Sequence, residues 1–139
     1  MVEEKITFKR LLEEADKAKS KAYAPYSRFS VGAALLTRSG KIFSGCNVEN
    51  ASYGLTICAE RVAVVKAISE GERYFHAIAV IADAGVYCRP CGACLQFLAE
   101  FGTDIQVVMG NPKGEYEVKT VAELLPMNFR LGSGKESER

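Results

Sequence analysis

The alternation of helix-like and strand-like segments along the chain constrains the fold more than any other feature. Apolar, strand-like segments occupy residues 29–37, 42–48, 76–83, 104–110 and 115–118. Helical patterns occupy residues 5–23, 58–71, 91–102 and 120–126. Strands that alternate with helices indicate a sheet with parallel pairs, covered by helices. We therefore predict an α/β protein of three layers (α/β/α), with a mixed five-stranded sheet flanked by helices.

Glycine, proline and capping residues predict where the helices begin and end. We expect Gly71 to stop the second helix. Pro90 is expected to open the third helix and Gly102 to close it. Thr120 and Glu123 have the spacing of a capping box at the start of the fourth helix.

The length and charge of the chain indicate one globular domain without a nucleic-acid surface. A chain of 139 residues suits a single domain, which we place at residues 1–130, followed by a polar, mobile tail at 131–139. The 18 basic and 17 acidic residues give a net charge of +1. This balance argues against a nucleic-acid partner and leaves no polybasic segment for a membrane surface.

The compartment is predicted from the start of the chain and from its cysteines. No apolar run approaches the ~20 residues of a membrane span. The opening "MVEEKITFKR" is charged and lacks the apolar region of a signal peptide, so we expect a cytoplasmic protein. Five cysteines in that compartment are better explained as thiols or metal ligands than as disulfides.

The stretch "YCRPCGACL" places three cysteines in two overlapping C-x-x-C pairs. A helix that begins at Pro90 sets Cys91 and Cys94 one turn apart near its N-terminus. The helix dipole favours thiolates there, and zinc is the ion expected for thiolate ligands. Cys88 precedes the proline and is predicted to lie outside the pair.

A second cysteine-bearing helix start offers a third ligand. If the two helix N-termini meet, Cys58 joins the metal pair. A fourth protein ligand would make the site structural, whereas an open position would hold a water that zinc activates. Glu60, two residues after Cys58, can then stand beside this water and act as a general acid and base.

The charge of such a site predicts a role for Arg61. Three thiolates outweigh Zn²⁺ and leave the site at about −1. Arg61 follows Cys58 by three residues, so both fall on similar faces of the helix. We predict that Arg61 donates hydrogen bonds to the ligand thiolates.

The motif "CAE" (58–60) followed by "PCGAC" (90–94) resembles the cytidine deaminase family, in particular its small homotetrameric, zinc-dependent branch. The resemblance extends from "AYAPYSRFSVGAAL" (22–35) to "LLPMNF" (124–129). It implies hydrolytic deamination of cytidine and deoxycytidine to uridine and deoxyuridine plus ammonia, in pyrimidine salvage. In this family zinc-bound hydroxide attacks C4 of the base and a non-ligating glutamate, here Glu60, shuttles protons.

The resemblance also implies a set of substrate-binding residues. Asn47 and Glu49, in "GCNVEN", are expected to hydrogen-bond the sugar hydroxyl, and Phe29 to pack on the pyrimidine. The Ala59 backbone is expected to bind the ring edge, and the Pro90 carbonyl to face the amino group. Phe129 matches the family's aromatic that reaches into the site of a neighbouring subunit, and Tyr53 matches one near the subunit contact.

Three alternatives compete with this interpretation. A structural zinc module would recruit a fourth ligand, such as Cys88 or Cys46, and would not need Glu60. A related deaminase could act on a nucleoside antibiotic such as blasticidin S. A polynucleotide deaminase is disfavoured by the balanced charge.

Two positions depart from the family pattern. Leu95 stands where relatives commonly have arginine, and Arg89 stands where they commonly have serine or glycine. The departures concern the surroundings of the zinc site, and Arg89 could replace some of the lost positive charge.

Overall fold

The structure, a computed structural model, describes residues 6–83 and 87–131. Its elements, in chain order, are α1 (Phe8–Lys19), β1 (Val31–Thr37), β2 (Ile42–Cys46), the 3₁₀ helix η1 (Tyr53–Leu55), α2 (Ala59–Ser69), β3 (Phe75–Ala82), α3 (Gly92–Ala99), β4 (Gln106–Gly110), β5 (Tyr116–Thr120) and α4 (Val121–Leu124). The predicted tail at 131–139 lies outside the described residues except for Leu131. Within the described ranges, no helix is long and apolar enough to span a bilayer.

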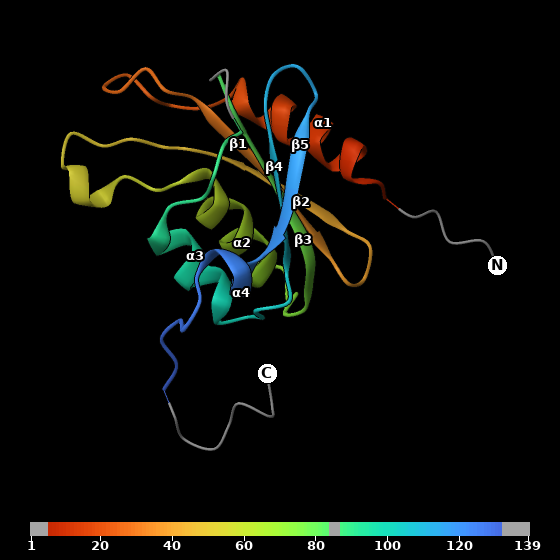
Figure 1. Ribbon diagram of the computed structural model, residues 1–139. Helices are drawn as coiled ribbons and strands as arrows, with labels where there is room; N and C mark the ends of the chain where they lie inside the picture. The colour runs from red at the N-terminus through yellow and green to blue at the C-terminus, as the bar shows by residue number, and fades with distance from the viewer. Residues whose placement is uncertain (1–5, 84–86, 132–139) are drawn as a thin grey trace.

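The five strands form one mixed sheet in the order β2-β1-β3-β4-β5 (Figure 1). Strand β1 pairs antiparallel with both β2 and β3, and β4 pairs antiparallel with β5. Strands β3 and β4 run parallel, with α3 in the connection between them. The predicted mixed five-stranded sheet is confirmed.

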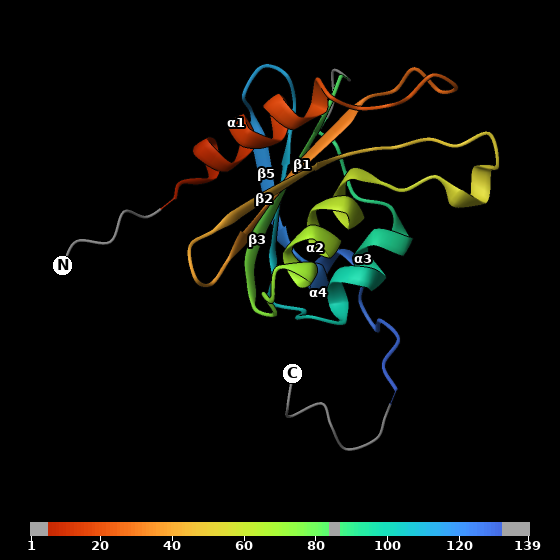
Figure 2. The same cartoon turned by 180° about the vertical axis from the view of Figure 1, so that it is seen from behind.

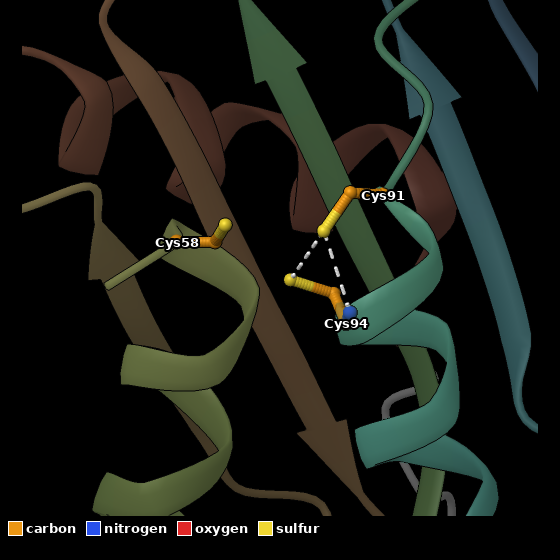
Figure 3. Close-up of side chains that lie close together, drawn as sticks. All are labelled: Cys58, Cys91 and Cys94. Atoms are coloured by element: carbon orange, nitrogen blue, oxygen red, sulfur yellow. Dashed lines mark hydrogen bonds between the residues drawn. The ribbon is translucent and has the colours of Figure 1, made fainter. Parts of the chain in front are cut away.

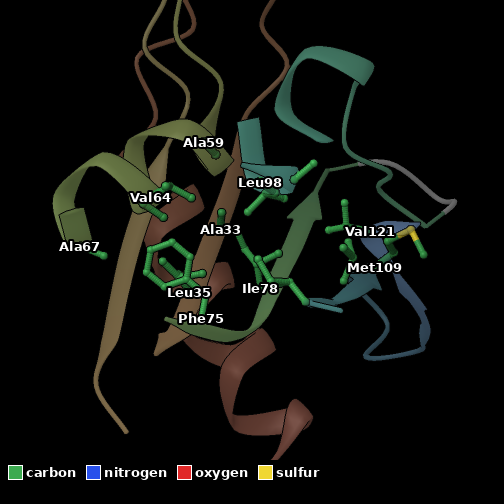
Figure 4. Close-up of a cluster of buried hydrophobic side chains, with 14 residues drawn as sticks. Ala33, Leu35, Ala59, Val64, Ala67, Phe75, Ile78, Leu98, Met109 and Val121 are labelled. Atoms are coloured by element: carbon green, nitrogen blue, oxygen red, sulfur yellow. The ribbon is translucent and has the colours of Figure 1, made fainter. Parts of the chain in front are cut away.

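Helices cover both faces of the sheet, as the views from the two sides show (Figures 1 and 2). Helix α1 covers one face, and α2, α3 and α4 lie on the other, where the N-terminal ends of α2 and α3 come close together (Figure 3). A buried hydrophobic cluster lies on each side: Leu11 and Ala15 of α1 belong to one, and Val64 and Leu98 of α2 and α3 belong to the other (Figure 4). The three-layer prediction is therefore confirmed.

Strand β3 lies in the middle of the sheet and is buried on both faces. Of its eight residues only His76 is exposed. Burial from both sides explains why the sequence here is a continuous apolar run, because no solvent-facing side chain is needed to alternate with the core-facing ones.

Helix α2 lies unusually close to strand β2 at Gly45. A Cβ atom on this glycine would lie 2.6 Å from the carbonyl oxygen of Ala59 and 2.6 Å from the amide nitrogen of Ala63. Only a residue without a side chain permits this approach, which fixes the N-terminal turn of α2 against the sheet. The residue that precedes this turn is Cys58.

The predicted helix boundaries are partly right. Gly71 follows α2 with φ +95°, as a helix-terminating glycine does, and the capping box of Thr120 and Glu123 is present. Pro90 does not begin α3: the helix begins at Gly92, and Cys91 is its N-cap. The proline lies in the extended approach to the helix because the side chain of Cys91 takes the capping role instead.

Candidate active site

Two cysteines cap the two helices that meet on one face of the sheet. Cys58 is the N-cap of α2 (φ −73°, ψ 154°), and Cys91 is the N-cap of α3 (φ −74°, ψ 167°). The Sγ atom of Cys91 accepts a hydrogen bond of 3.4 Å from the backbone N–H of Cys94. Each cap residue is extended, so its side chain lies at the open end of its helix.

These two thiols and Cys94 form one cluster (Figure 3). The three sulfur atoms all lie within 4.8 Å of one another, and those of Cys91 and Cys94 are 3.5 Å apart. Tetrahedral Zn–S bonds of ~2.3 Å place ligand sulfurs about 3.8 Å apart. Soft thiol donors at this spacing fit a zinc ion. Among the residues that the structure describes, the cluster comprises these three side chains and no fourth ligand.

The sulfur cluster stabilises a thiolate at Cys58. Hydrogen bonding from Cys94, with the nearby Arg61 guanidinium, lowers the pKa of Cys58 to about 5 against the opposing effect of burial. The pKa of Cys94 is raised, chiefly because its thiol proton is held by Cys58 and because it is buried. A thiolate is the form that binds metal.

Arg61 lies beside the cluster on the first turn of α2. Its Nη2 atom donates to the Sγ atom of Cys58 at 3.5 Å. Its Nε atom is buried and, among the described residues, has no hydrogen-bond partner. The guanidinium therefore faces the sulfur atoms as a half-buried positive charge.

A cavity of about 260 Å³ opens onto the cluster. Its walls include Cys58, Cys91 and five residues predicted from the sequence: Phe29, Asn47, Glu49, Ala59 and Glu60. They also include residues that were not assigned to the site: Ser27, Val31, Thr56, Ile57, Cys88 and Arg89. Proximity in sequence could have indicated all of these except Cys88, because each of the others lies within two residues of a predicted site residue.

Glu60 is a buried carboxyl group in this cavity, with 5% of its surface exposed. Burial is the largest cause that raises its pKa, and the negative charge at Cys58 adds to it, so the pKa reaches about 7. The positive charge of Arg61 opposes this shift. Such a group holds or releases a proton near neutral pH.

Asn47 connects two parts of the cavity wall. Its Oδ1 atom accepts from the backbone N–H of Val31 at 2.9 Å, and its Nδ2 atom donates to the carbonyl of Phe29 at 2.8 Å. The side chain therefore fixes the segment that carries Phe29. One N–H and one lone pair of an amide that makes these two bonds are left for other partners.

Glu49 is oriented by the turn that precedes Phe29. Its carboxylate accepts from the backbone N–H groups of Tyr26 at 2.9 Å and Ser27 at 3.1 Å, and from the Ser27 hydroxyl. These hydrogen bonds, the hydroxyl first, lower the pKa of Glu49. The same hydroxyl oxygen accepts from the Phe29 N–H at 3.0 Å, so Ser27 ties the carboxylate to the aromatic residue.

Of three other residues named from the sequence, Cys88 lines the cavity, whereas Cys46 and Phe129 do not. Cys88 lies in its wall, and burial with the nearby Glu60 charge raises its pKa to about 12. Cys46 lies on β2 and donates to the carbonyl of Lys21 instead. Phe129 does not line the cavity of its own chain: 69% of its surface is exposed, and its backbone is bonded to the side chain of Gln96.

The two departures noted in the sequence differ in their exposure: Leu95 is buried, whereas the Arg89 side chain is exposed. Leu95 is buried, as an apolar residue on the inner face of α3. Arg89 lines the cavity and pairs with Glu117 of β5 at 3.4 Å. Arg89 therefore places a guanidinium in the cavity wall, with its charge partly offset by the Glu117 carboxylate.

Comparison with known proteins identifies relatives over most of the chain. A family model described as the cytidine and deoxycytidylate deaminase zinc-binding region matches residues 6–110. The cytidine deaminase of Halalkalibacterium halodurans is 54% identical over 120 residues, which cover 86% of this chain and 91% of the relative. That of Sporosarcina psychrophila is 51% identical over 121 residues, which cover 86% of this chain and 89% of the relative.

Solved structures show the same architecture. A crystal structure of cytidine deaminase from Burkholderia pseudomallei matches with a TM-score of 0.86 and 50% identity, over 88% of this chain and 99% of the other. That from Mycobacterium tuberculosis matches with a TM-score of 0.81 and 39% identity, over 91% of this chain and 100% of the other. The resemblance carried by "CAE" and "PCGAC" is confirmed.

Proposed function

Because the chain belongs to the cytidine and deoxycytidylate deaminase family, we propose that it catalyses the zinc-dependent hydrolytic deamination of cytidine and deoxycytidine to uridine and deoxyuridine plus ammonia. The observation that carries the proposal is a three-thiol cluster, two of whose members, Cys58 and Cys91, line the same cavity as the buried carboxyl group of Glu60. A structural zinc module would need a fourth ligand, which the cluster lacks among the described residues.

The zinc ion would be held by Cys58, Cys91 and Cys94. Arg61 would donate a hydrogen bond to the Cys58 thiolate. When bound, zinc supplies Lewis-acid chemistry that makes water reactive near neutral pH. The positive guanidinium offsets part of the negative charge of the three thiolates. This makes the site with bound zinc less negative and supports metal binding.

Glu60 is proposed to carry both protons of the attacking water. One proton goes to N3 of the pyrimidine, and the other goes to the amino group on C4, which leaves as ammonia when its bond to C4 breaks. The product keeps the water oxygen at C4. The burial of Glu60 in the cavity wall supports this role. A proton that the carboxyl group takes up must return to the substrate and not to bulk water, so the group has to be shielded from solvent.

The rest of the cavity is proposed to bind a neutral nucleoside. Glu49 accepts hydrogen bonds from the sugar hydroxyls. The N–H and the lone pair of the Asn47 amide that make no bond within the protein donate to and accept from these hydroxyls. The ring of Phe29 packs on the pyrimidine face. The backbone of Ala59 binds the ring edge, and the carbonyl of Pro90 faces the amino group.

We propose that the active form is a homotetramer in which Phe129 closes the site of a neighbouring subunit. The exposure of Phe129 outside its own cavity supports this arrangement. We place the enzyme in the cytoplasm, in pyrimidine salvage. Five free cysteines suit a reducing compartment.

Replacement of Glu60 by glutamine tests the reaction. Glu60→Gln keeps the shape and the zinc ligands but removes the carboxylate, so kcat should fall by about 10²–10⁴ while the zinc content stays unchanged. Zinc is measured by atomic emission, and turnover by loss of cytidine absorbance. Retained activity would contradict the proton-shuttle role, and loss of zinc would show that Glu60 acts as a ligand.

A substrate panel tests the specificity. Steady-state assays with cytidine, deoxycytidine, blasticidin S and single-stranded DNA should show turnover of the first two only. Turnover of blasticidin S above that of cytidine would instead support a nucleoside-antibiotic deaminase.

A further inference from the structure

The side chain of Gln96 makes two hydrogen bonds to the backbone of Phe129. Its Nε2 atom donates to the carbonyl of Phe129 at 2.9 Å, and its Oε1 atom accepts from the Phe129 N–H at 3.1 Å. A side-chain amide that satisfies both backbone groups of one residue copies the pairing of a β-strand neighbour. The contact links α3 to a segment more than thirty residues later in the chain.

The segment around Phe129 has no regular structure of its own to hold it. Residues 125–131 lie beyond α4, and Met127 has a left-handed backbone conformation with φ +56°. Asn128 donates to the carbonyl of Leu125 at 3.1 Å, and Arg130 reaches the Thr103 hydroxyl at 3.4 Å. Between these contacts, the Gln96 amide is the group that fixes the position of Phe129 itself.

The result is an ordered backbone that carries an exposed ring. Phe129 has 69% of its surface exposed although both of its backbone polar groups are bonded to Gln96. An aromatic side chain held in this way loses little further backbone entropy when it enters a pocket of another molecule. A free loop would have to be ordered at that moment.

We propose that Gln96 is a positioning residue that presents Phe129 to the active site of a neighbouring subunit. The inference rests on the proposed role of Phe129. Because Gln96 lies two residues after Cys94 on the same helix, the zinc-binding helix of one subunit also sets the aromatic wall of the next site. Gln96 acts through Phe129 and touches no substrate.

A double-mutant cycle tests this coupling. Gln96→Met keeps the length of the side chain and removes both hydrogen bonds, so KM for cytidine should rise by about five- to tenfold with little change in kcat and no change in zinc content. Phe129→Ala should raise KM at least as much. In the doubly substituted protein, Gln96→Met should add no further increase, because its route of action is already lost.

Two further variants sharpen the result. Gln96→Glu retains an acceptor for the Phe129 N–H but not the donor to its carbonyl, so KM should lie between those of the wild type and Gln96→Met. Glu100→Gln, an exposed change at the C-cap of the same helix, should leave KM unchanged. Hydrogen exchange of the peptide that contains Phe129 should accelerate in Gln96→Met and remain slow in Glu100→Gln.

The outcomes separate the inference from the proposed function. If Phe129→Ala raises KM and Gln96→Met does not, the positioning role is wrong while the shared site stands. If the two effects on KM add in the double mutant, Gln96 acts by another route and the inference is again overturned. If Phe129→Ala leaves KM unchanged, the role of Phe129 in the proposed function fails, and the inference fails with it.

Discussion

Cys58 and Cys91 occupy the same structural position on two different helices: each is the N-cap, and each places its sulfur at the positive end of a helix dipole. Cys94 completes the cluster from inside the first turn of α3. Two helix ends therefore favour negative charge at one point, which suits a group of thiolates around a metal ion.

Removal of one capping thiol should abolish metal binding. In Cys58→Ala the cluster keeps only Cys91 and Cys94, and two thiolates do not hold zinc as three do. Bound zinc after dialysis should be almost completely lost, and activity with it. Cys46→Ala, which changes a thiol that donates to the Lys21 carbonyl, should bind zinc like the wild type. Equal zinc in both variants would contradict the assignment of Cys58.

Removal of the guanidinium should weaken metal binding without abolishing it. Arg61→Ala takes away the donor 3.5 Å from the Cys58 sulfur, and loss of such an outer hydrogen bond typically costs 10–100-fold in metal affinity. Competition with a chromophoric chelator measures the change. Arg73→Ala serves as the control, since Arg73 donates to the carbonyls of Ile68 and Glu72. An Arg61→Ala protein with unchanged zinc affinity and full activity at neutral pH would disprove this role.

Addition of one methyl group at Gly45 should destabilise the fold. The new Cβ in Gly45→Ala would meet the Ala59 carbonyl oxygen and the Ala63 nitrogen at 2.6 Å, so α2 must shift from the sheet. Overpacking of this kind costs about 1–3 kcal/mol, measured as the free energy of unfolding in urea. Gly54→Ala is the matched control, because, apart from its two chain neighbours, no atom of the described residues lies within 4 Å of its Cβ position. Comparable stability of the two variants would show that the backbone adjusts freely at Gly45.

The hydrogen bond from Ser27 to Glu49 should contribute to stability in a pH-dependent way. The pKa of Glu49 is lowered below its ordinary value of 4.5, with the Ser27 hydroxyl as the largest cause. A lowered pKa stabilises the fold above the unfolded-state value, and the effect is lost as pH falls through the folded-state pKa. Ser27→Ala should therefore be less stable than the wild type at neutral pH, with a gap that narrows in acid.

Urea unfolding at neutral pH and at the acid end of the Glu49 titration measures this gap. Ser69→Ala is the control, because its hydroxyl donates to the Lys66 carbonyl, a group that carries no charge at any pH. A gap for Ser27→Ala that does not change with pH would show that the Glu49 charge is not involved.

The fold was predictable because local signals agree with tertiary packing. The apolar run of β3 and the capping box at Thr120 each indicate an element that the structure contains. Helix starts were less predictable: Pro90 looks like a first helical residue, but the Cys91 side chain competes for the capping position and moves the start to Gly92. A sequence pattern does not show which of two adjacent signals prevails.

The site was predictable in composition and less so in its contacts. The motif "CAE" with "PCGAC" indicated the three thiols and Glu60. That Asn47 uses its amide to fix the backbone of Phe29 and Val31 could not be read from "GCNVEN", because those contacts join segments brought together by sheet pairing. The presence of Cys88 in the cavity wall depends in the same way on how the chain approaches α3.

The two buried hydrophobic clusters include none of the three zinc-cluster thiols. We therefore expect the apolar burial that stabilises the sheet and its helices to hold the fold without the ion, unlike in zinc fingers, which are unfolded without metal. A chelator should leave a folded apoenzyme that regains activity when zinc is returned. The supply of zinc would then set what fraction of these chains is active without deciding how many are folded.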